Sequence, residues 1–426
     1  MGGHLNESAQ KHGRNVISDT VQSPLLQPSS AMAVHRAVYW TSYLLLIAAL
    51  TGVCLMMHGV PFVWRHAPYA FSKAAKSPST VTERVKLVVV TCDSMLNLTL
   101  TNIKSAVAFT AMPLELLLFA DEENREALQQ TISLWPESVL KRVHYKVSAV
   151  KFPEPDSKTW RDLFRPCASQ RLFLPKEEKF KWKRHTSLLS SDSSLLPDVD
   201  AVIYVDADVL FVSPIEMLWQ HFASMNTSHL AAMAPEGEDY ANNWYRNFSK
   251  HPFYQPLGVN SGVMLMNLTR MRKFGLEEHM RPLQQIYGEH IPWGDQDLLN
   301  IFFGTNPERL LVFSCRWNYR TDHCMHGTHC TEGPPAVVHG SRNVFTEYSE
   351  PAFWELHQAM REYELGESLG DTFIDVFKDR LSKSHNTSCE HEFLKHVVHW
   401  EKMARAIDNA TNRTRRSRAQ GLKKNL

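Results

Sequence analysis

Two aspartates one residue apart stand at the end of an apolar run. The run is Ala201-Val-Ile-Tyr-Val, and Asp206 and Asp208 follow it directly. These residue types predict a buried strand whose carboxyl end presents both acids on one face. Two carboxylates on one face repel each other unless a cation lies between them. Because hard oxygen ligands suit Mg²⁺ or Mn²⁺, which bind substrate phosphates in turn, we expect a metal–phosphate site rather than a capped strand end.

A histidine far along the chain could complete this site. His339 follows two valines and precedes Gly340, at the end of a further predicted strand over 336–340. Two carboxylates and one neutral imidazole leave room for water and a diphosphate in an octahedral Mn²⁺ shell. A lone histidine is more often a satisfied core or surface residue, but its place at a strand end favours a third protein ligand.

The acid pair also fits phosphatases that form an aspartyl-phosphate. Asp206 would then be the nucleophile and Asp208 the general acid. Those enzymes need a later Gly-Asp-x-x-x-Asp for Mg²⁺, and although Gly294-Asp295 occurs, Leu299 occupies the required position. The acid strand is about the fourth predicted strand here, whereas those enzymes open with it. Both observations disfavour this alternative.

The elements that must position these residues alternate between strand and helix. Strands are predicted over 85–92, 116–120, 143–150, 201–205, 231–234, 258–267 and 336–340, and helices over 97–109, 125–135 and 214–222 and from about 291. This alternation is typical of an α/β layer fold with a parallel sheet, whose ligands bind at the carboxyl ends of the strands. Neither GxGxxG nor GxxxxGK[ST] occurs, so the usual dinucleotide and P-loop fingerprints are missing.

The first 83 residues predict three segments. Residues 1–36 are polar and without periodicity, and are expected to be a disordered cytosolic tail. Residues 37–57 carry no charge and, at about 1.5 Å per residue, span about 30 Å, which predicts a transmembrane signal-anchor helix. A cleaved signal peptide would have a shorter apolar region and a small-residue cleavage site. Residues 58–83, with scattered proline and serine, predict a luminal stem.

Glycosylation motifs and cysteines orient this anchor. Seven Asn-x-Ser/Thr motifs follow it, at Asn97, Asn226, Asn247, Asn267, Asn386, Asn409 and Asn412. Six cysteines also follow it, and an even number in a luminal chain fits disulfides. Basic residues stand on both sides of the predicted membrane span, so the positive-inside rule does not determine its orientation. We therefore expect a single-pass type II membrane protein of the ER or Golgi, with its catalytic part in the lumen.

Three of these cysteines, Cys315, Cys324 and Cys330, fall in one loop. Six cysteines allow 15 pairings, so only the local candidates Cys315–Cys324 or Cys324–Cys330 are predicted. The remaining partners are Cys92, Cys167 and Cys389. A zinc site with His323 and His329 is the alternative, but a luminal setting favours disulfides.

The rest of the chain divides into a catalytic domain over 84–345, a helical extension over 346–412 and a basic, frayed tail over 413–426. The 426 residues contain 46 basic and 45 acidic side chains, a net charge of +1 that does not suggest a nucleic-acid binder. A hydrophobic content of 43% is sufficient for a proper core.

Four blocks resemble glycosyltransferase family 8. They are Tyr204-Val-Asp-Ala-Asp-Val-Leu-Phe, Gly258-Val-Asn-Ser-Gly-Val-Met-Leu-Met-Asn, Trp293-Gly-Asp-Gln-Asp-Leu-Leu-Asn and Val338-His-Gly, within a match over about 86–345. The resemblance implies a retaining, Mn²⁺-dependent transferase that uses a nucleotide sugar and has a GT-A fold, a Rossmann-like mixed sheet.

Further blocks resemble the glucoside xylosyltransferases. They are Met233-Ala-Pro-Glu, Asn243-Trp-Tyr with His251-Pro-Phe-Tyr, the block from Asn260 to Arg272 and the stretch from Cys315 to Cys324. This resemblance implies transfer of xylose from UDP-xylose, in α1,3 linkage, to O-linked glucose on EGF repeats of Notch-type receptors.

The resemblance also implies roles for single residues. It makes Asp206, Asp208 and His339 the metal ligands, with Asp206 also at the ribose. It places Arg171 on the donor and near the metal-binding acids. The donor would further contact Ala207, Gly340, Asp297 through its sugar hydroxyls, and Thr91 and Asp93 in a poorly matched uracil pocket. Many family members have a lysine several residues after the His-Gly pair; here Arg342 is the nearest basic residue, and the resemblance implies its contact with the β-phosphate.

On the acceptor side the resemblance places Asn260 and Ser261. Trp244 and Trp293 could stack on sugar rings, although large aromatic residues are more often core. Asp295 could lie there too or simply cap the helix that it opens.

Gln296 matches the side chain on the β face of the anomeric carbon. An amide is a poor nucleophile, so front-face departure and attack are expected, with the leaving phosphate oxygen taking the acceptor proton. A glutamine nucleophile is the alternative.

Two other functions remain open at this point. The donor could be UDP-glucose or UDP-galactose, because the sequence does not show whether the pocket has room for a C6 hydroxymethyl. The chain could also be a catalytically silent EGF- or glycan-binding protein, although binding alone does not require a metal–diphosphate site.

Overall fold

The computed structural model describes residues 84–110, 112–176, 195–325, 327, 329–383 and 386–424, without the side chains after 413. The chain divides into a unit over 1–79 and a second unit that begins at Thr80. The predicted tail, anchor helix and stem over 1–83 lie outside the described residues. Among the residues that are described, no helix has both the length and the apolar character that a membrane crossing requires.

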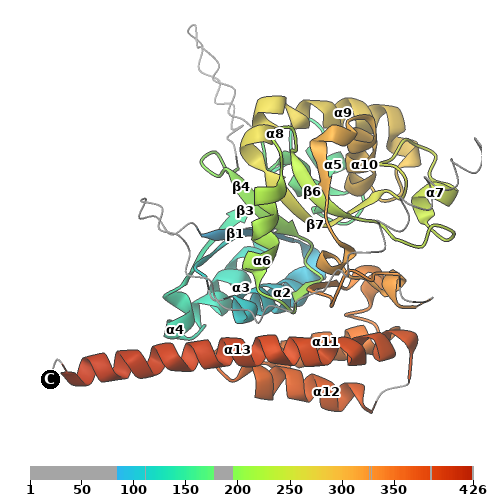
Figure 1. Ribbon diagram of the computed structural model, residues 1–426. Helices are drawn as coiled ribbons and strands as arrows, with labels where there is room; N and C mark the ends of the chain where they lie inside the picture. Colours follow the sequence, from blue (N-terminus) through green and yellow to red (C-terminus); the bar gives the residue numbers. More distant parts are fainter. Residues whose placement is uncertain are drawn as a thin grey trace, which may run out of the picture. The chain divides into compact units, whose positions relative to one another are not determined.

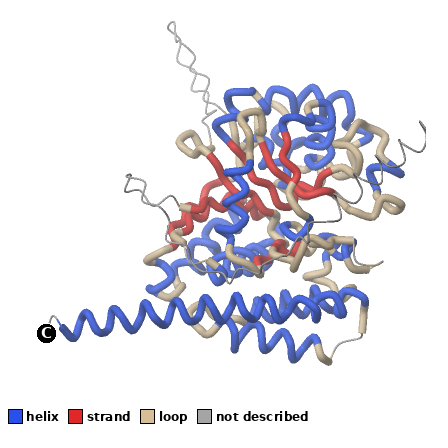
Figure 2. The backbone as a smooth tube through the Cα atoms, viewed as in Figure 1, coloured by secondary structure: helices blue, strands red, loops and turns tan. Residues whose placement is uncertain are grey.

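A mixed sheet lies at the centre of the described part of the chain (Figures 1 and 2). Its strands are β1 (Val85–Thr91), β2 (Leu114–Ala120), β3 (Val143–Ala149), β4 (Ala201–Val205), β6 (Ala231–Pro235), β7 (Val259–Asn267) and β8 (Leu310–Val312). They lie in the order β3-β2-β1-β4-β7-β6-β8. The first four are parallel, and β7 runs antiparallel to both β4 and β6. The predicted α/β class is confirmed.

Helices cover both faces of this sheet. They are α2 (Leu96–Phe109), α3 (Glu122–Ser133), α4 (Glu137–Leu140), α5 (Ser157–Arg161), α6 (Ile215–Trp219), α7 (Trp244–Phe248), α8 (Leu268–Phe274), α9 (Leu276–Tyr287) and α10 (Asp295–Thr305). Helices α2, α3 and α6 share one apolar core with the sheet, and α8, α9 and α10 share the other. Because both faces are covered, β4 at the centre of the sheet is apolar along its whole length.

A short two-stranded sheet, β5 (Val209–Phe211) and β9 (Val337–His339), lies next to the end of β4. The two strands are antiparallel, with Val209 opposite His339. The predicted strand over 336–340 is therefore present, although shorter, and it pairs with the residues that follow the acid pair.

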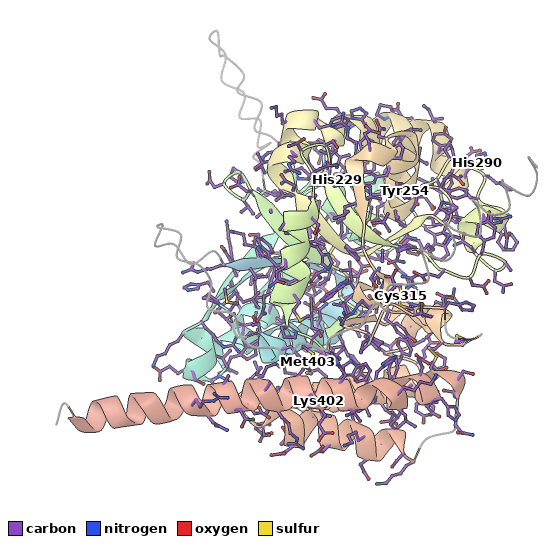
Figure 3. The ribbon with its side chains drawn as sticks, viewed as in Figure 1. His229, Tyr254, His290, Cys315, Lys402 and Met403 are labelled. Carbon is purple, nitrogen blue, oxygen red and sulfur yellow. A yellow bond between two sulfur atoms is a disulfide. The ribbon has the colours of Figure 1, made fainter. Side chains whose placement is uncertain are left out.

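The C-terminal extension is helical, as predicted, and consists of α11 (Pro351–Glu362), a turn of π-helix (Gly370–Ile374), α12 (Asp375–Leu381) and α13 (Ser388–Lys424). It has its own apolar core, in which Phe373 meets Phe109 of α2 edge to face at 6.1 Å. Met403 lies on α13 and is labelled in Figure 3. Its sulfur accepts a hydrogen bond from the hydroxyl of Ser213. Helix α13 continues through the basic segment that was expected to fray, so the backbone does not change conformation at Arg413.

The predicted local disulfides are wrong, whereas the expectation of disulfides is confirmed. The bridges are Cys92–Cys167, Cys315–Cys330 and Cys324–Cys389. All six described cysteines are therefore paired, so the zinc alternative has no thiolates to use. The pairing depends on the beginning of α13 packing against the loop around Cys324, a contact 65 residues apart in the chain.

Removing the Cys324–Cys389 bridge by a double change to serine should lower the free energy of unfolding by about 2–5 kcal/mol. The bridge ties α13 to the catalytic domain across 65 residues. The matched control is removal of the Cys315–Cys330 bridge, which spans 15 residues. Because this bridge closes a shorter loop, its removal should lower the free energy of unfolding by about 1 kcal/mol less. Urea unfolding measures the free energy of unfolding of both variants. A larger loss for the Cys315–Cys330 variant would contradict the expectation.

The seven predicted glycosylation asparagines all lie in described residues. Six are exposed: Asn97, Asn226, Asn247, Asn386, Asn409 and Asn412. The seventh, Asn267, is partly buried and caps α8 by accepting a hydrogen bond from the backbone N–H of Arg270. Use of these motifs stays a prediction.

Candidate functional site

Asp206, Asp208 and His339 come together where β4, β5 and β9 meet. The imidazole Nε2 of His339 lies 3.4 Å from Asp208 Oδ1 and 3.8 Å from Asp206 Oδ2. One ligand atom from each residue lies within 4.8 Å of the other two. The sequence predicted this grouping, and the antiparallel pairing of β5 with β9 produces it.

The ring of His339 is bonded to Asn318 through Nδ1, the nitrogen that does not face the aspartates. Its Nδ1 lies 2.9 Å from the amide oxygen of Asn318, which can only accept a hydrogen bond. Nδ1 therefore carries the proton, and the lone pair of Nε2 faces the two aspartates. Two carboxylates and one available imidazole nitrogen fit a divalent cation.

Gly262 leaves the space that the His339 ring occupies. A Cβ atom at this position of β7 would lie 2.1 Å from Cε1 of the imidazole. Gly262→Ala should therefore displace the ring and weaken Mn²⁺ binding by about tenfold or more. Calorimetric Mn²⁺ titration measures this, with Gly237→Ala as control, since a Cβ there meets nothing closer than 3.9 Å. Unchanged Mn²⁺ affinity in Gly262→Ala would contradict a role for His339 in binding the ion.

Arg171 joins the acid pair to the beginning of α10. It lies in a 3₁₀ helix, Ala168–Phe173, that the Cys92–Cys167 bridge ties to the end of β1. Its Nη2 donates to Asp206 Oδ1 at 2.7 Å, and its Nε lies 2.7 Å from Asp295 Oδ2. The guanidinium is buried and also donates to the backbone oxygen of Ser261 at 2.6 Å.

Asp295 is buried against this arginine. Its side chain is 2% exposed, and it is the first residue of α10 after the N-cap Gly294. Burial raises the pKa of Asp295 to about 6, although Arg171 opposes the rise. Asp295 forms an ion pair in place of the expected helix cap, and its contact with an acceptor stays a prediction.

Gln296 is fixed at both ends of its amide. Its Oε1 accepts from the backbone N–H of Ser261 at 3.1 Å, and its Nε2 donates to Glu236 Oε2 at 3.1 Å. The side chain is 7% exposed. The structure therefore places Gln296 next to Ser261, as a shared site requires.

Asp297 does not reach the surface of the site. Its Oδ1 accepts from the hydroxyl of Tyr245 at 2.8 Å and lies 3.3 Å from His251 Nε2. Its Oδ2 accepts from the backbone N–H of Trp293 at 2.7 Å. Both oxygens have protein partners and the side chain is fully buried. A contact of Asp297 with donor hydroxyls stays a prediction.

The predicted acceptor-side residues lie at the beginning of β7 and beside α10. Asn260 and Ser261 are 4% and 3% exposed, and both contact groups of the site. The rings of Trp244 and Trp293 are partly exposed and lie 5.3 Å apart between centroids. These two rings thus form one aromatic surface.

The predicted nucleotide-side residues are spread over two loops. Thr91 is fully buried and bonded to Thr99, whereas Asp93 is exposed with a φ of 54°. Gly340 donates its backbone N–H to the backbone carbonyl oxygen of Asp208 at 2.7 Å. Thr91 therefore has no free side chain for a base.

Ala207 and Arg342 complete the predicted nucleotide side. Ala207 is partly exposed between the two acids. Arg342 is exposed and bonded to Asp322 at 2.7 Å.

The sequence analysis missed four polar residues that support the site: Glu236, Tyr245, Asn300 and Asn318. Each is buried and hydrogen-bonded to a predicted site residue or to its backbone. Glu236 follows β6 directly, so the signal that identified Asp206, an acid at a strand end, could have found it. The other three carry no comparable signal.

Comparisons with known proteins identify the family of this chain. The family model for Glycosyl transferase family 8 matches residues 92–340, more than half of the chain. Glucoside xylosyltransferase 2 of Xenopus laevis is 39% identical over 344 residues, 77% of each chain. Glucoside xylosyltransferase 1 of Gallus gallus is 36% identical and that of Rattus norvegicus 37%, each over 82% of this chain and 77% of the relative.

Proposed function

The chain belongs to glycosyl transferase family 8 and is a glycosyltransferase, and we propose that it transfers xylose from UDP-xylose, with retention and in α1,3 linkage, to glucose O-linked to EGF repeats of Notch-type proteins. The observation that carries this proposal is the alignment with a glucoside xylosyltransferase over 77% of both chains. The resemblance read from the sequence is thereby confirmed. The GT-A fold and the Notch-type acceptor are part of the proposal.

Asp206, Asp208 and His339 would hold the divalent cation, Mn²⁺ or Mg²⁺. A cation bound there neutralises charge on the departing diphosphate. Arg171 holds Asp206 in place through its buried guanidinium, so the acid pair is oriented before the donor arrives. Arg342 is the basic side chain proposed for the β-phosphate, and its exposed ion pair with Asp322 would open to reach it.

Retention requires that one bond breaks and another forms on the same face of the sugar. The bond between the anomeric carbon and the phosphate oxygen breaks, and the acceptor hydroxyl oxygen bonds to that carbon. The acceptor proton passes to the leaving phosphate oxygen. Gln296 would lie at the opposite face, and since its amide is bonded to Ser261 and Glu236 at its two ends, a covalent role for it is disfavoured.

The acceptor would approach past the aromatic surface of Trp244 and Trp293. Sugar rings stack on such faces because their C–H groups are apolar. Asn260 and Ser261 provide polar groups beside Gln296. Asp297 supports this side indirectly, through Tyr245 and the backbone of Trp293.

The proposed location is the ER or Golgi, as a single-pass type II membrane protein with the catalytic domain in the lumen. Three disulfides and six exposed glycosylation asparagines support this proposal. Both features belong to an oxidising compartment.

The test is a panel of UDP-sugars offered to the purified full chain with an O-glucosylated EGF repeat, with Mn²⁺ or with EDTA. Transfer from UDP-xylose alone, abolished by EDTA, is the expected result. Transfer from UDP-glucose or UDP-galactose would retain the enzyme class and reject xylose. Binding of the EGF repeat without turnover of any donor would indicate a silent binder.

A further inference from the structure

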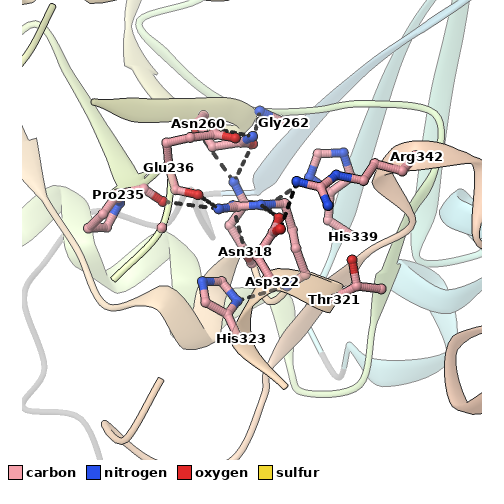
Figure 4. A network of polar contacts seen from close by, with 12 residues as sticks. Pro235, Glu236, Asn260, Gly262, Asn318, Thr321, Asp322, His323, His339 and Arg342 are labelled. Atoms are coloured by element: carbon pink, nitrogen blue, oxygen red, sulfur yellow. Dashed lines mark hydrogen bonds and ion pairs between the residues drawn. The ribbon is translucent and has the colours of Figure 1, made fainter. Parts of the chain in front are cut away.

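A buried chain of hydrogen bonds leads from His339 to Glu236 (Figure 4). Behind His339, Asn318 donates through its Nδ2 to Asn260 Oδ1 at 2.7 Å. Asn260 donates in turn through its Nδ2 to Glu236 Oε2 at 2.8 Å. None of these four side chains is more than 7% exposed, so water does not compete for the bonds.

The same carboxylate oxygen also receives the amide of Gln296. Glu236 Oε2 thus accepts two hydrogen bonds, one from the side of the metal ligand and one from the proposed anomeric face. On its other side, Gln296 Oε1 meets the backbone N–H of Ser261, which can only donate. The orientation of the Gln296 amide is therefore determined by its two neighbours.

The direction of the chain of hydrogen bonds is set at Asn260, by Glu236 as acceptor on one side and the backbone N–H of Gly262 as donor on the other. A carboxylate accepts, so Asn260 must turn its Nδ2 to Glu236 and its Oδ1 the other way, where Gly262 N–H also donates to it. Asn318 must then present Nδ2 to Asn260 and Oδ1 to the ring. As a result, His339 carries its proton on Nδ1 and keeps Nε2 bare.

A buried guanidinium accompanies this carboxylate. Arg320 is fully buried and donates to the backbone oxygens of Glu236 and Asn318, so it is bonded to two members of the chain. Burial raises the pKa of Glu236, and the charge of Arg320 opposes the rise. The carboxylate of Glu236 is thus a buried group close to a buried positive charge.

We propose that Glu236 is a positioning residue that acts on both sides of the reacting centre. Through Asn260 and Asn318 it holds His339 in the tautomer that a cation needs, and directly it holds the amide of Gln296. The inference rests on the proposed function only in taking His339 as a metal ligand and Gln296 as a group of the donor site. Partners of this kind orient metal-binding imidazoles in proteins generally.

The experiment uses the full chain without donor and measures two properties. Electron paramagnetic resonance of free Mn²⁺ gives the dissociation constant, and the ¹⁵N spectrum of the histidine rings gives the tautomer of His339, assigned by its absence in His339→Ala. Glu236→Met removes the acceptor, whereas Glu236→Gln retains one oxygen and the side-chain volume. Glu238→Met is the matched control, because that carboxylate contacts His323 instead of the chain.

Glu236→Met should weaken Mn²⁺ binding by about tenfold or more and mix the two tautomers of His339. Glu236→Gln should give a smaller loss, because a neutral acceptor forms a weaker bond and no longer fixes the direction of the chain. Glu238→Met should match the wild type. In donor kinetics the Glu236 variants should also lose kcat, since Gln296 is released.

A double-mutant cycle tests whether the effect travels along the chain. Asn318→Leu removes the direct partner of His339, so adding Glu236→Met should weaken Mn²⁺ binding no further. Additive losses would overturn the proposal, as would wild-type affinity and tautomer in both Glu236 variants. If Glu236→Met does not fold, the tautomer of His339 in Glu236→Gln decides whether Glu236 is a positioning residue.

Both measurements stand apart from the sugar assignment. Mn²⁺ titration and the ring spectrum need no donor, so they hold if the panel selects another UDP-sugar. Conversely, xylosyl transfer together with unaffected Glu236 variants would reject this inference alone.

Discussion

Asp208→Asn should reduce sugar transfer by about a thousandfold and leave the fold intact. A bound metal is worth several kcal/mol of charge stabilisation in the transition state, and each 1.36 kcal/mol changes a rate about tenfold. Of the two aspartates, Asp208 lies closer to Nε2 of His339. Asp208 is also partly exposed, so the substitution removes a proposed ligand without opening the core. Initial rates at saturating donor and Mn²⁺ measure the effect.

The matched control for this substitution is Asp198→Asn. Asp198 is an exposed acid ahead of the same strand, outside the site, and its loss should leave the rate within about twofold. Thermal unfolding of both variants should agree with the wild type. If Asp208→Asn kept a tenth or more of the wild-type rate, the acid pair would not be the metal site.

Arg171→Met should lower the free energy of unfolding by about 3–5 kcal/mol, the usual cost of removing one partner of a buried ion pair. Its guanidinium is 4% exposed and lies between Asp206 and the fully enclosed Asp295. Without it, Asp295 is left as an unpaired buried acid. Transfer should also be lost, because Asp206 is no longer held. Urea unfolding gives the first quantity and steady-state rates the second.

A second substitution separates charge from packing. Asp295→Asn in the Arg171→Met background should recover part of the lost stability, because the orphaned acid becomes neutral. It should not recover transfer, since Asp206 still lacks its partner. Strictly additive destabilisation by the two changes would show that the ion pair contributes nothing beyond packing.

The sequence by itself predicted most strands, although not β5 or β8, and the grouping of Asp206, Asp208 and His339. Apolar runs with the period of strands are local features, and each of them predicted a strand that the structure contains. Asp206, Asp208 and His339 were identifiable because they stand at or next to the ends of such runs. The acid pair follows β4 of the large sheet, and His339 comes to it because β9 pairs with β5, the strand directly after the acids. The family followed from four blocks of this kind.

Only the tertiary structure decided what lies behind these residues. Cys324 pairs with Cys389 because α13 begins against its loop, and no local pattern indicates a contact across 65 residues. Asp297 is buried because α10 packs against Tyr245, whose hydroxyl donates to its carboxylate. Asn318 and Glu236 come from loops with no strand or helix period, and their roles arise from partners far away in the chain. Hydrogen bonds are directional and short, so which amide meets which carboxylate is set by the packing of whole elements.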